Sequence, residues 1–303
     1  MSILAGAQTS VMVAGITGRE AVSMVRSSLD YGALIVGGVT PGKGGMSVHG
    51  VPVYDSVQQL LQRSRVDAAV ISVPAAAARD AALEAIEAGI GLVVITTERI
   101  PRLDVAQILE SARGRGTRVI SPNALGLISP GQTKLGSIGG PAEDARRAYT
   151  PGLVGIMSRS GGMTTELASL LTLHGIGQST CVSIGGDPLV GSSFADLLPL
   201  FEEDPRTRAV VVYTEPGGRM EHELARALRE KPHRVRVVAF IAGRFMDGLP
   251  GVRFGHAGTI VQGEEDTAAR KAELLREAGV RVAQDLSEIP RLVAAALGEA
   301  MAG

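Results

Sequence analysis

The first part of the chain alternates short apolar runs with Ala-rich amphipathic stretches. Runs of β-branched and small apolar residues at 11–14 and 92–95 predict buried strands, and the segments 77–88 and 104–113 predict helices. Strands that alternate with helices of this length imply βαβ crossovers and a parallel sheet. The pattern therefore predicts a doubly wound domain over residues 1–130, with further strands at 34–36, 68–71 and 118–120.

The pattern stops at residues 131–150, which contain several Gly and Pro residues and are interpreted as a linker. It resumes with a helix whose apolar stripe begins at Met163 and recurs four, seven and eight residues later. The second half, residues 151–303, is predicted to be another doubly wound domain, with strands at 154–157, 209–213 and 235–241 and helices at 267–278 and 287–297. The predicted fold class is α/β, with two doubly wound parallel-sheet domains.

Composition limits the core and the partners. Hydrophobic residues make up 45% of the 303 residues and aromatic residues only 3%, so we expect a core of small aliphatic side chains, which suit helices packed on a parallel sheet. The formal net charge is −1 and no basic surplus exists to bind a polyanion, so nucleic acid is not an expected partner. The single cysteine, Cys181, excludes an internal disulfide and a thiolate zinc site.

The sequence also bears on the cellular compartment. No apolar stretch is long enough to span a membrane, and the first ten residues lack a basic flank followed by an apolar run. A single cysteine fits a reducing compartment. We therefore expect a soluble, cytoplasmic protein with no membrane partner and no metal site of its own.

Ligands of open α/β sheets bind beyond the carboxyl ends of the strands, so the Gly-rich loops that leave strands are candidate sites. The loop 15–18 either binds a phosphorylated ligand at a helix N-terminus or is an ordinary tight turn. It does not match G-x-G-x-x-G, so NAD binding is weakly supported. The loop 37–44 is close to a P-loop, but Gly44 replaces the magnesium-holding Ser or Thr and Pro41 removes a backbone donor. Lys43 in this loop remains a candidate phosphate clamp.

Two further loops carry candidate chemistry. Ser160, Gly161 and Gly162 open a predicted helix, where they either bind an anion or form an ordinary cap through Ser160. Glu215 ends a strand, where a side chain points toward the crevice, although a turn acid is the usual explanation. His256 has only Gly and Ala as close neighbours, which leave room for a bulky group. It is either a nucleophile oriented by an acceptor such as Glu215 or a simple turn histidine.

The chain resembles the alpha subunit of succinate–CoA ligase, of the ADP- or GDP-forming type, nearly from end to end. The most specific blocks are 37–45, 158–161, 177–182, 184–188 and 255–258. The resemblance implies an N-terminal Rossmann-like CoA-binding domain and a C-terminal flavodoxin-like ligase domain that bears a phosphohistidine. It also implies a set of CoA-contacting residues, namely Thr17, Gly18, Arg19, Glu20, Lys43, Thr96, Thr97 and Glu98.

The resemblance further implies roles in the second domain and a partner chain. His256 matches the histidine that is phosphorylated, and Glu215 matches the acid that hydrogen-bonds it. The helix opening at residues 160–162 matches the one whose N-terminus holds the phosphate. ATP or GTP with Mg²⁺ would bind mainly to an ATP-grasp beta subunit, in a heterodimer or a dimer of heterodimers. Phosphate would pass from nucleotide to His256 and then to a small carboxylate, which CoA captures as a thioester.

Several substrate-side positions depart from the family pattern. Gly162 stands where the family has Thr, and Thr165 replaces a Tyr that helps shape the carboxylate pocket. The region 160–167 is instead similar to ATP-citrate lyase and citryl-CoA synthetase. The expected substrate is succinate, with a place in the tricarboxylic acid cycle, or alternatively malate, citrate or another small di- or tricarboxylate. A non-catalytic CoA-binding paralogue is the second alternative, and the intact block around His256 argues against it.

Overall fold

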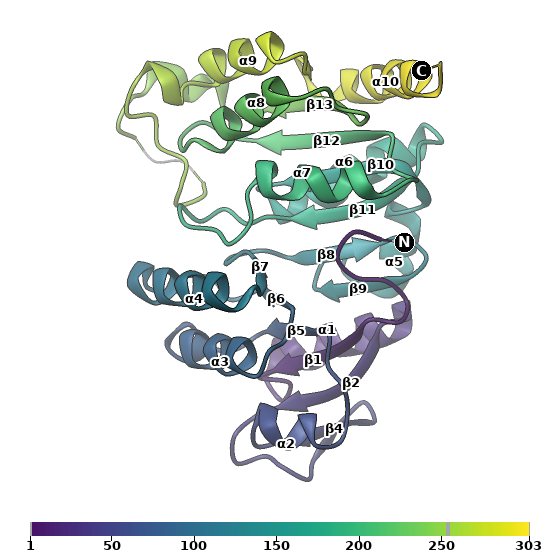
Figure 1. Ribbon diagram of the computed structural model, residues 1–303, viewed down its shortest axis with the longest axis vertical. Helices are drawn as coiled ribbons and strands as arrows, with labels where there is room; N and C mark the ends of the chain where they lie inside the picture. Colours follow the sequence, from purple (N-terminus) through teal and green to yellow (C-terminus); the bar gives the residue numbers. More distant parts are fainter. Residues whose placement is uncertain (1, 253–254, 303) are drawn as a thin grey trace. The chain divides into compact units, whose positions relative to one another are not determined.

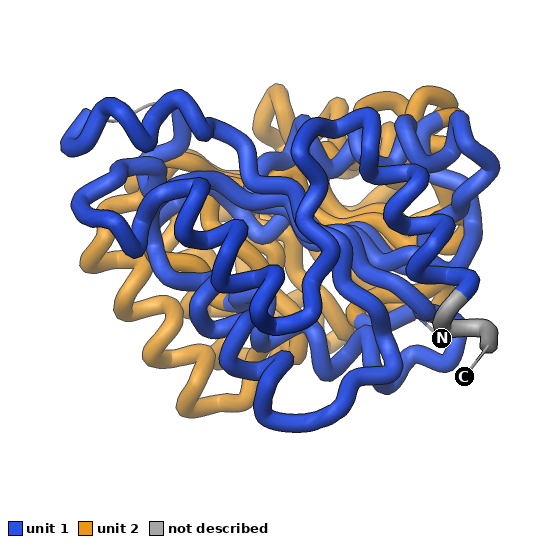
Figure 2. The backbone as a smooth tube through the Cα atoms, turned by 90° about the horizontal axis from the view of Figure 1, so that it is seen from above, with its two compact units in different colours: residues 1–3, 148–188, 192–303 blue, residues 4–147, 189–191 orange. Residues whose placement is uncertain are grey.

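The computed structural model describes residues 2–252 and 255–302, which form two units. The N-terminal unit comprises residues 4–147 and 189–191, and the C-terminal unit comprises residues 1–3, 148–188 and 192–303 (Figure 2). Each unit contains a sheet of mainly parallel strands with helices packed on it (Figure 1). The predicted α/β class with two doubly wound domains is therefore confirmed.

The sheet of the N-terminal unit has the strand order β3-β4-β2-β1-β5-β6-β7. Its strands pair in parallel except for β3 and β4, which are antiparallel. Because the chain goes from β1 to one neighbour and later to the other, the carboxyl end of β1 is a topological switch point. The strands are β1 (Ser10–Ala14), β2 (Leu34–Val39), β3 (Ser47–Val48), β4 (Val51–Tyr54), β5 (Ala68–Ile71), β6 (Leu92–Ile95) and β7 (Arg118–Ile120); the helices are α1 (Arg19–Tyr31), α2 (Val57–Leu61), α3 (Ala75–Glu87) and α4 (Arg102–Arg115).

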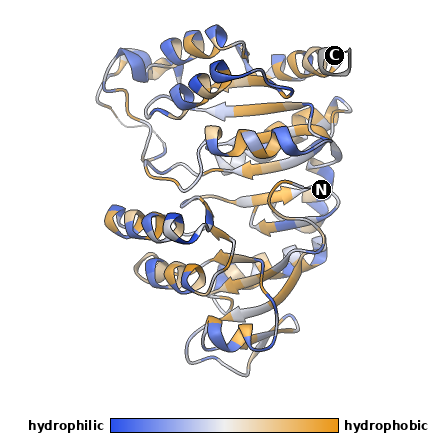
Figure 3. Ribbon diagram, viewed as in Figure 1, coloured by the Kyte–Doolittle hydropathy of each residue, from blue (hydrophilic) through white to orange (hydrophobic). Residues whose placement is uncertain are grey.

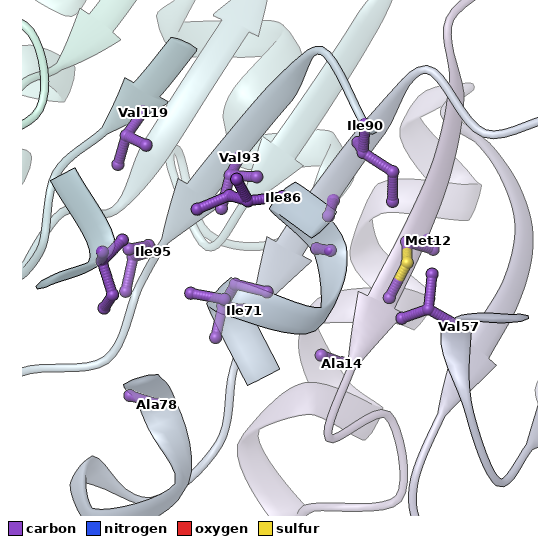
Figure 4. Close-up of a cluster of buried hydrophobic side chains, with 14 of the residues drawn as sticks. Met12, Ala14, Val57, Ile71, Ala78, Ile86, Ile90, Val93, Ile95 and Val119 are labelled. Carbon is purple, nitrogen blue, oxygen red and sulfur yellow. The ribbon is translucent and has the colours of Figure 1, made fainter. Parts of the chain in front are cut away.

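Small side chains allow close packing in this unit. Strands β1, β5 and β6 are buried along their whole length, which explains their unbroken apolar sequences. Ala78, Ala82 and Ala85 of α3 are fully buried in the same cluster as Ile71 of β5 and Val93 of β6 (Figure 4). The helix lies close to the sheet because alanine adds little width between the two layers.

The stretch that we interpreted as a linker, residues 131–150, instead contains secondary structure. Strands β8 (Gly126–Ser129) and β9 (Thr133–Gly136) form an antiparallel hairpin, and α5 (Ala142–Ala148) follows. Such short elements show too little periodicity to be found in a sequence. Gly136 has a φ of 97°, and a Cβ on it would lie 2.4 Å from the Leu125 carbonyl oxygen, so this glycine is part of the strand pairing and not a linker residue.

In the C-terminal unit, strands β14, β13, β12, β10 and β11 lie side by side in that order and are parallel. The chain leaves β10 for β11 on one side and later enters β12 on the other, so the carboxyl end of β10 is a second switch point. The strands are β10 (Pro151–Ser158), β11 (Gln178–Ser183), β12 (Ala209–Thr214), β13 (Arg236–Ile241) and β14 (Arg281–Val282); the helices are α6 (Gly161–Leu173), α7 (Phe194–Glu203), α8 (Met220–Glu230), α9 (Ala268–Glu277) and α10 (Ile289–Ala302), with 3₁₀ turns η1 (Arg244–Gly248), η2 (Glu264–Asp266) and η3 (Leu286–Glu288).

Hydrophobic residues follow the strands of both units, and the helices mix hydrophobic and hydrophilic positions, as amphipathic helices on a sheet do (Figure 3). The loop predicted at 37–44 differs from expectation, because Gly37 and Gly38 lie within β2, which ends at Val39, and only the later residues form a loop. A Cβ on Gly38 would lie 2.3 Å from Ile16 Cγ2, so this glycine serves strand packing and not phosphate binding.

Candidate functional site

The loop 15–18 occupies the switch point of the N-terminal unit, at the carboxyl end of β1. Gly15 has a φ of 80°, and a Cβ on it would lie 2.3 Å from the Ser72 carbonyl oxygen. Only glycine fits there. Gly18 is the N-cap of α1 and makes no side-chain cap, so the first-turn amides of the helix face the open end of the sheet with their partial positive charge.

A cavity of about 380 Å³ opens beside this helix end, lined by residues from the ends of β1, β5 and β6, which are Gly18, Arg19, Glu20, Ala21, Ser72, Val73, Pro74, Ala75, Thr96, Thr97 and Glu98. Six of the eight predicted CoA positions are in this set. Two hydroxyls fix its wall, because Thr96 Oγ1 donates to the Ile71 carbonyl at 3.0 Å and Thr97 Oγ1 donates to the Val73 carbonyl at 2.7 Å. The site is thus a preformed cavity at a helix N-terminus, which suits a phosphorylated ligand.

The two remaining predicted CoA positions are not in the lining set. Thr17 turns its hydroxyl to Thr40 at 3.3 Å, which links the loop 15–18 to the loop that follows β2. Lys43 is exposed on that second loop. The segment 72–75, which also lines the cavity, was missed by sequence reasoning. It follows β5, the neighbour of β1, so a strand-order argument could have found it.

The C-terminal unit brings His256 and Glu215 together, 41 positions apart in sequence. His256 Nδ1 lies 2.8 Å from Glu215 Oε2, and Thr259 Oγ1 donates to the same carboxylate oxygen at 3.1 Å. Glu215 follows the last residue of β12, so its backbone is anchored by the sheet. Its side chain is 14% exposed and that of His256 is 30% exposed. The carboxylate fixes the proton on Nδ1 and leaves Nε2 as the nucleophilic ring nitrogen.

One glycine makes room for the imidazole, and a second makes room for the neighbouring Arg159. A Cβ on Gly186 would lie 2.4 Å from His256 Cδ2, so the imidazole packs directly on the backbone that follows β11. A Cβ on Gly258 would lie 2.7 Å from a guanidinium nitrogen of Arg159. The contact at Gly186 is closer than a side chain there would permit, so backbone packs on one face of the ring and holds it in place.

Hydrogen bonds, burial and nearby charges shift the pKa values of both His256 and Glu215. The hydrogen bond to Glu215 raises the pKa of the His256 imidazole above its usual value, against burial and the Arg159 charge, which lower it. Burial alone raises the pKa of the Glu215 carboxyl, but the hydrogen bond and charge of His256, the charge of Arg159 and the Thr259 hydroxyl together hold that pKa below its usual value. The two groups therefore stabilise each other's charged forms.

Arg159 was not predicted, although it lies in a block that carries the family resemblance. It follows β10 at the second switch point, is 2% exposed, and donates to the carbonyls of Gly186 at 3.3 Å and Asp187 at 3.1 Å. A buried guanidinium beside His256 places a fixed positive charge next to the imidazole. Its signal in the sequence was weak, because an arginine at a strand end is usually exposed.

The predicted anion site at residues 160–162 begins α6. Ser160 Oγ accepts from the Met163 amide at 3.3 Å, so Ser160 is the N-cap of this helix. The amides of Gly161 and Gly162 lie in the first turn, where the helix end attracts anions. Thr165 Oγ1 lies 2.8 Å from the Tyr149 hydroxyl, so the pocket position that differs from the family is paired with a buried tyrosine.

The other four histidines have partners within the structure. His174 is the C-cap of α6, and its Nδ1 lies 2.9 Å from the Leu170 carbonyl. His222 contacts Glu265, and His233 contacts Glu202. His49 contacts the Val22 carbonyl. Among the described residues, no three His, Cys, Asp or Glu side chains gather in a way that could hold a metal ion. No helix within residues 2–252 and 255–302 is both long and apolar enough to cross a bilayer.

Comparison with known proteins identifies both units. The CoA binding domain family matches residues 7–99, and the CoA-ligase family matches residues 157–281. A subunit named succinate–CoA ligase [ADP-forming] subunit alpha 1, from Archaeoglobus fulgidus, is 44% identical over 295 residues, which are 97% of this chain and 97% of that protein. The corresponding alpha subunit from Methanothermobacter thermautotrophicus is 46% identical over 298 residues, covering 98% of this chain and 97% of that protein.

Solved structures give a second comparison. The ATP citrate lyase of Methanosaeta concilii, in complex with (3S)-citryl-CoA, has a TM-score of 0.90 and 26% identity over 97% of this chain. The ATP citrate lyase of Methanothrix soehngenii, in complex with citrate and coenzyme A, has a TM-score of 0.91 and 26% identity over 98% of this chain. This chain spans only about half of those lyase chains, 50% and 51% of their lengths.

Proposed function

Because this chain belongs to the succinate–CoA ligase alpha-subunit family, as its motifs predicted, we propose that His256 carries phosphate from a nucleotide to a carboxylate during acyl-CoA formation. The CoA-binding fold, the CoA-ligase domain and the class of nucleoside-diphosphate-forming acid–CoA ligase are confirmed. The observation that carries the role of His256 is the 2.8 Å contact between its Nδ1 and Glu215 Oε2.

The geometry supports a three-step relay. Neutral His256 attacks the γ-phosphorus through Nε2, the bond to the leaving nucleoside diphosphate breaks, and Glu215 stabilises the positive charge that forms on the ring. A carboxylate oxygen of the substrate then attacks the phosphorus, which releases His256 and forms an acyl phosphate. The CoA thiolate attacks the acyl carbon and expels inorganic phosphate. Arg159 and the N-terminus of α6 offset the charge of the phosphoryl group in the first two steps.

We assign CoA to the N-terminal unit, with part of the molecule in its cavity. Gly18, Arg19 and Glu20 lie at the N-terminus of α1, where we propose that they meet the phosphates of CoA, together with Thr17 and Lys43 on the neighbouring loops. Thr96, Thr97 and Glu98, which follow β6, also line the cavity. The support for this assignment is the match of the CoA binding domain to residues 7–99, which contain all eight positions.

The nucleotide and Mg²⁺ belong, in this proposal, to a beta subunit. The loop 37–44 lacks the magnesium-holding hydroxyl, and its first two glycines are strand residues. The relatives are named as alpha subunits and as ADP-forming, which supports a beta partner and favours ATP over GTP. We propose an ATP-grasp beta subunit in a heterodimer or a dimer of heterodimers.

Succinate is the first candidate substrate, because relatives at 44–46% identity carry that name. A second candidate class, citrate, malate or a related di- or tricarboxylate, is favoured by the match to citrate-bound and citryl-CoA-bound lyases and by Thr165, which pairs with Tyr149 where the family has a larger side chain. A panel of carboxylates, assayed for CoA-thioester formation by the assembled enzyme, separates these two classes directly.

Labelling tests the role of His256. The chain, assembled with its beta subunit and given γ-labelled nucleotide, is expected to gain an acid-labile, alkali-stable label that succinate or another carboxylate with CoA removes. His256→Asn is expected to abolish the label. His222→Asn, which alters another His–Glu pair with a 3.0 Å contact, serves as the matched control and retains it. Equal label on His256→Asn would place the phosphate on another residue and overturn the role of His256. No label on the unaltered chain would leave the CoA-binding paralogue.

A further inference from the structure

A fully buried ion pair contacts the backbone of Glu215, the partner of His256. Lys271 of α9 and Glu221 of α8 are both 0% exposed, and Lys271 Nζ lies 2.6 Å from Glu221 Oε2. The ammonium also donates to the backbone carbonyls of Glu215 at 3.1 Å and Gly217 at 2.5 Å. Glu221 in turn accepts from Thr214, the last residue of β12. The lysine thus binds the segment that carries the acid of the site.

The backbone carbonyls of the segment 215–217 need a hydrogen-bond donor such as Lys271. It leaves β12, so the carbonyls of Glu215 and Gly217 have no partner strand and would otherwise be buried without hydrogen bonds. Gly217 has a φ of 84°, and a Cβ on it would lie 2.5 Å from the Gly258 carbonyl oxygen. The segment therefore packs directly against the loop that carries His256, and its backbone position sets the contact between the two side chains.

The helix that presents Lys271 is itself anchored. Asp247 of η1 accepts from the first two amides of α9, with Oδ1 at 2.8 Å from the Ala268 nitrogen and Oδ2 at 3.0 Å from the Ala269 nitrogen. The Gly217 amide donates to the Asp266 carbonyl, just before α9, at 3.0 Å. The start of α9 is thus fixed from two sides, which gives the lysine a rigid base.

If position 271 served only to fill the core, an apolar residue would be expected there instead of a lysine. Removing an ammonium and a carboxylate from water is costly, and apolar residues of similar volume fill such positions with equal or greater stability. What an apolar side chain cannot do is donate to two carbonyls at once. We propose that Lys271 is a positioning residue for the phosphoryl carrier, holding the backbone of residues 215–217 so that Glu215 meets His256 Nδ1. This inference rests on the proposed role of His256.

The direction in which the pKa of His256 changes when Lys271 is replaced distinguishes a positioning role from an effect of the lysine charge alone. The charged groups that face His256 are Glu215 after β12, Arg159 after β10 and Asp187 after β11. If Lys271 acted on His256 only through its charge, removing that charge would raise the pKa of the imidazole. If Lys271 positions Glu215, its removal loosens the hydrogen bond that is the main cause of the raised pKa, so that pKa falls toward 6.5.

The test is Lys271→Met, which keeps the length of the side chain and removes its donors. The pKa of His256, followed by NMR and assigned with His256→Asn, is expected to fall, and the rate of His256 phosphorylation in the assembled enzyme is expected to fall about ten- to a hundredfold. Lys134→Met is the matched control. Lys134 is also 1% exposed and hydrogen-bonded to Ser27 at 2.7 Å, but it lies in the N-terminal unit, so both readouts stay unchanged.

A second variant guards against misfolding, since Lys271→Met leaves Glu221 buried without its partner. Lys271→Met combined with Glu221→Leu removes both charges and is expected to fold and to show the same lowered pKa. An unchanged or raised pKa in either folded variant overturns the inference, and so does failure of both to fold, which would make Lys271 a support of the unit. Because the titration needs no nucleotide, a failure of the proposed relay would show separately, as unlabelled wild-type protein with the pKa change intact.

Discussion

The two units use the same position in the fold for opposite kinds of site. Each places a loop and a helix N-terminus at the switch point of a parallel sheet, at the end of β1 in one unit and β10 in the other. In the N-terminal unit the walls are backbone, hydroxyls and exposed side chains such as Arg19 and Glu20 around a cavity of about 380 Å³. In the C-terminal unit Arg159 is buried, His256 and Glu215 are partly buried, and the last two are already paired.

The difference suits the functions that we propose for the two sites. A large phosphorylated ligand that binds and leaves needs open volume and amides that solvent can reach. A group that gains and loses a phosphoryl charge benefits from dipoles and charges fixed before the reaction, in a place that excludes water. The buried Arg159 and the Glu215–His256 pair meet the second requirement, and the N-terminal cavity meets the first. Substitutions should accordingly cost more in the C-terminal unit.

The largest effect is expected for Glu215→Gln. The amide keeps the shape but cannot stabilise the charged imidazole, so the rate of His256 phosphorylation should fall about a hundredfold. The same change removes the main cause of the raised pKa of His256, so the pH–rate midpoint should move to lower pH. Rapid-quench measurements of the labelled histidine across pH give both numbers.

The matched control for this variant is Glu265→Gln, since Glu265 forms a His–Glu pair with His222 but is 51% exposed. It should leave the phosphorylation rate and its pH dependence unchanged. A small loss for Glu215→Gln, similar to that of the control, would mean that burial and pairing add nothing at this site and would remove the contrast between the units.

A smaller effect is expected in the N-terminal unit, for Arg19→Ala. Arg19 is the first residue of α1, where a cation opposes the helix dipole unless an anion binds beside it. Removing it should weaken CoA binding about tenfold, equivalent to about 1.4 kcal/mol, and the loss should shrink as salt is added. Calorimetric titration with CoA measures this, and His256 labelling by nucleotide should not change.

Arg63→Ala, at an exposed position outside the cavity lining, changes net charge equally and should leave CoA affinity within error of wild type. Equal weakening by both substitutions would show that only the overall charge matters. An unchanged affinity for Arg19→Ala would assign the phosphates of CoA to another part of the cavity.

The sequence predicted the strands that are buried on both faces, because a run such as residues 92–95 has no other stable environment. It also predicted the Gly-rich switch-point loops and the pairing of His256 with Glu215, the latter as one of two alternatives until a family resemblance favoured it. Short elements such as β9 and α5 were missed, because four to seven residues carry little periodicity.

The sequence pattern did not predict which charged side chains are buried. Lys271 occupies a helix position where a solvated lysine is the default expectation, and only the tertiary packing of α8, α9 and the end of β12 turns it inward. Arg159 is similar, since its burial depends on Gly186 and Gly258, which are distant in sequence. A glycine reveals which side chain it accommodates only when the fold is known.

The smallest effect concerns stability and pH. The raised pKa of His256 gives stabilisation that is complete below its unfolded value of 6.5 and is lost as pH rises through the folded value, whereas the lowered pKa of Glu215 gives stabilisation above 4.5 that is lost as pH falls. His256→Asn should therefore cost about 1 kcal/mol more near pH 5.5 than near pH 9, measured by denaturant unfolding. Asp67, whose pKa is lowered by Ser10, is ionised at both values, so Asp67→Asn should cost the same at each. An equal cost at both pH values for His256→Asn would mean that the contact between His256 and Glu215 adds no stability as an ion pair. The contrast between a paired, charged site in the C-terminal unit and an open cavity in the N-terminal unit would then lose its electrostatic part.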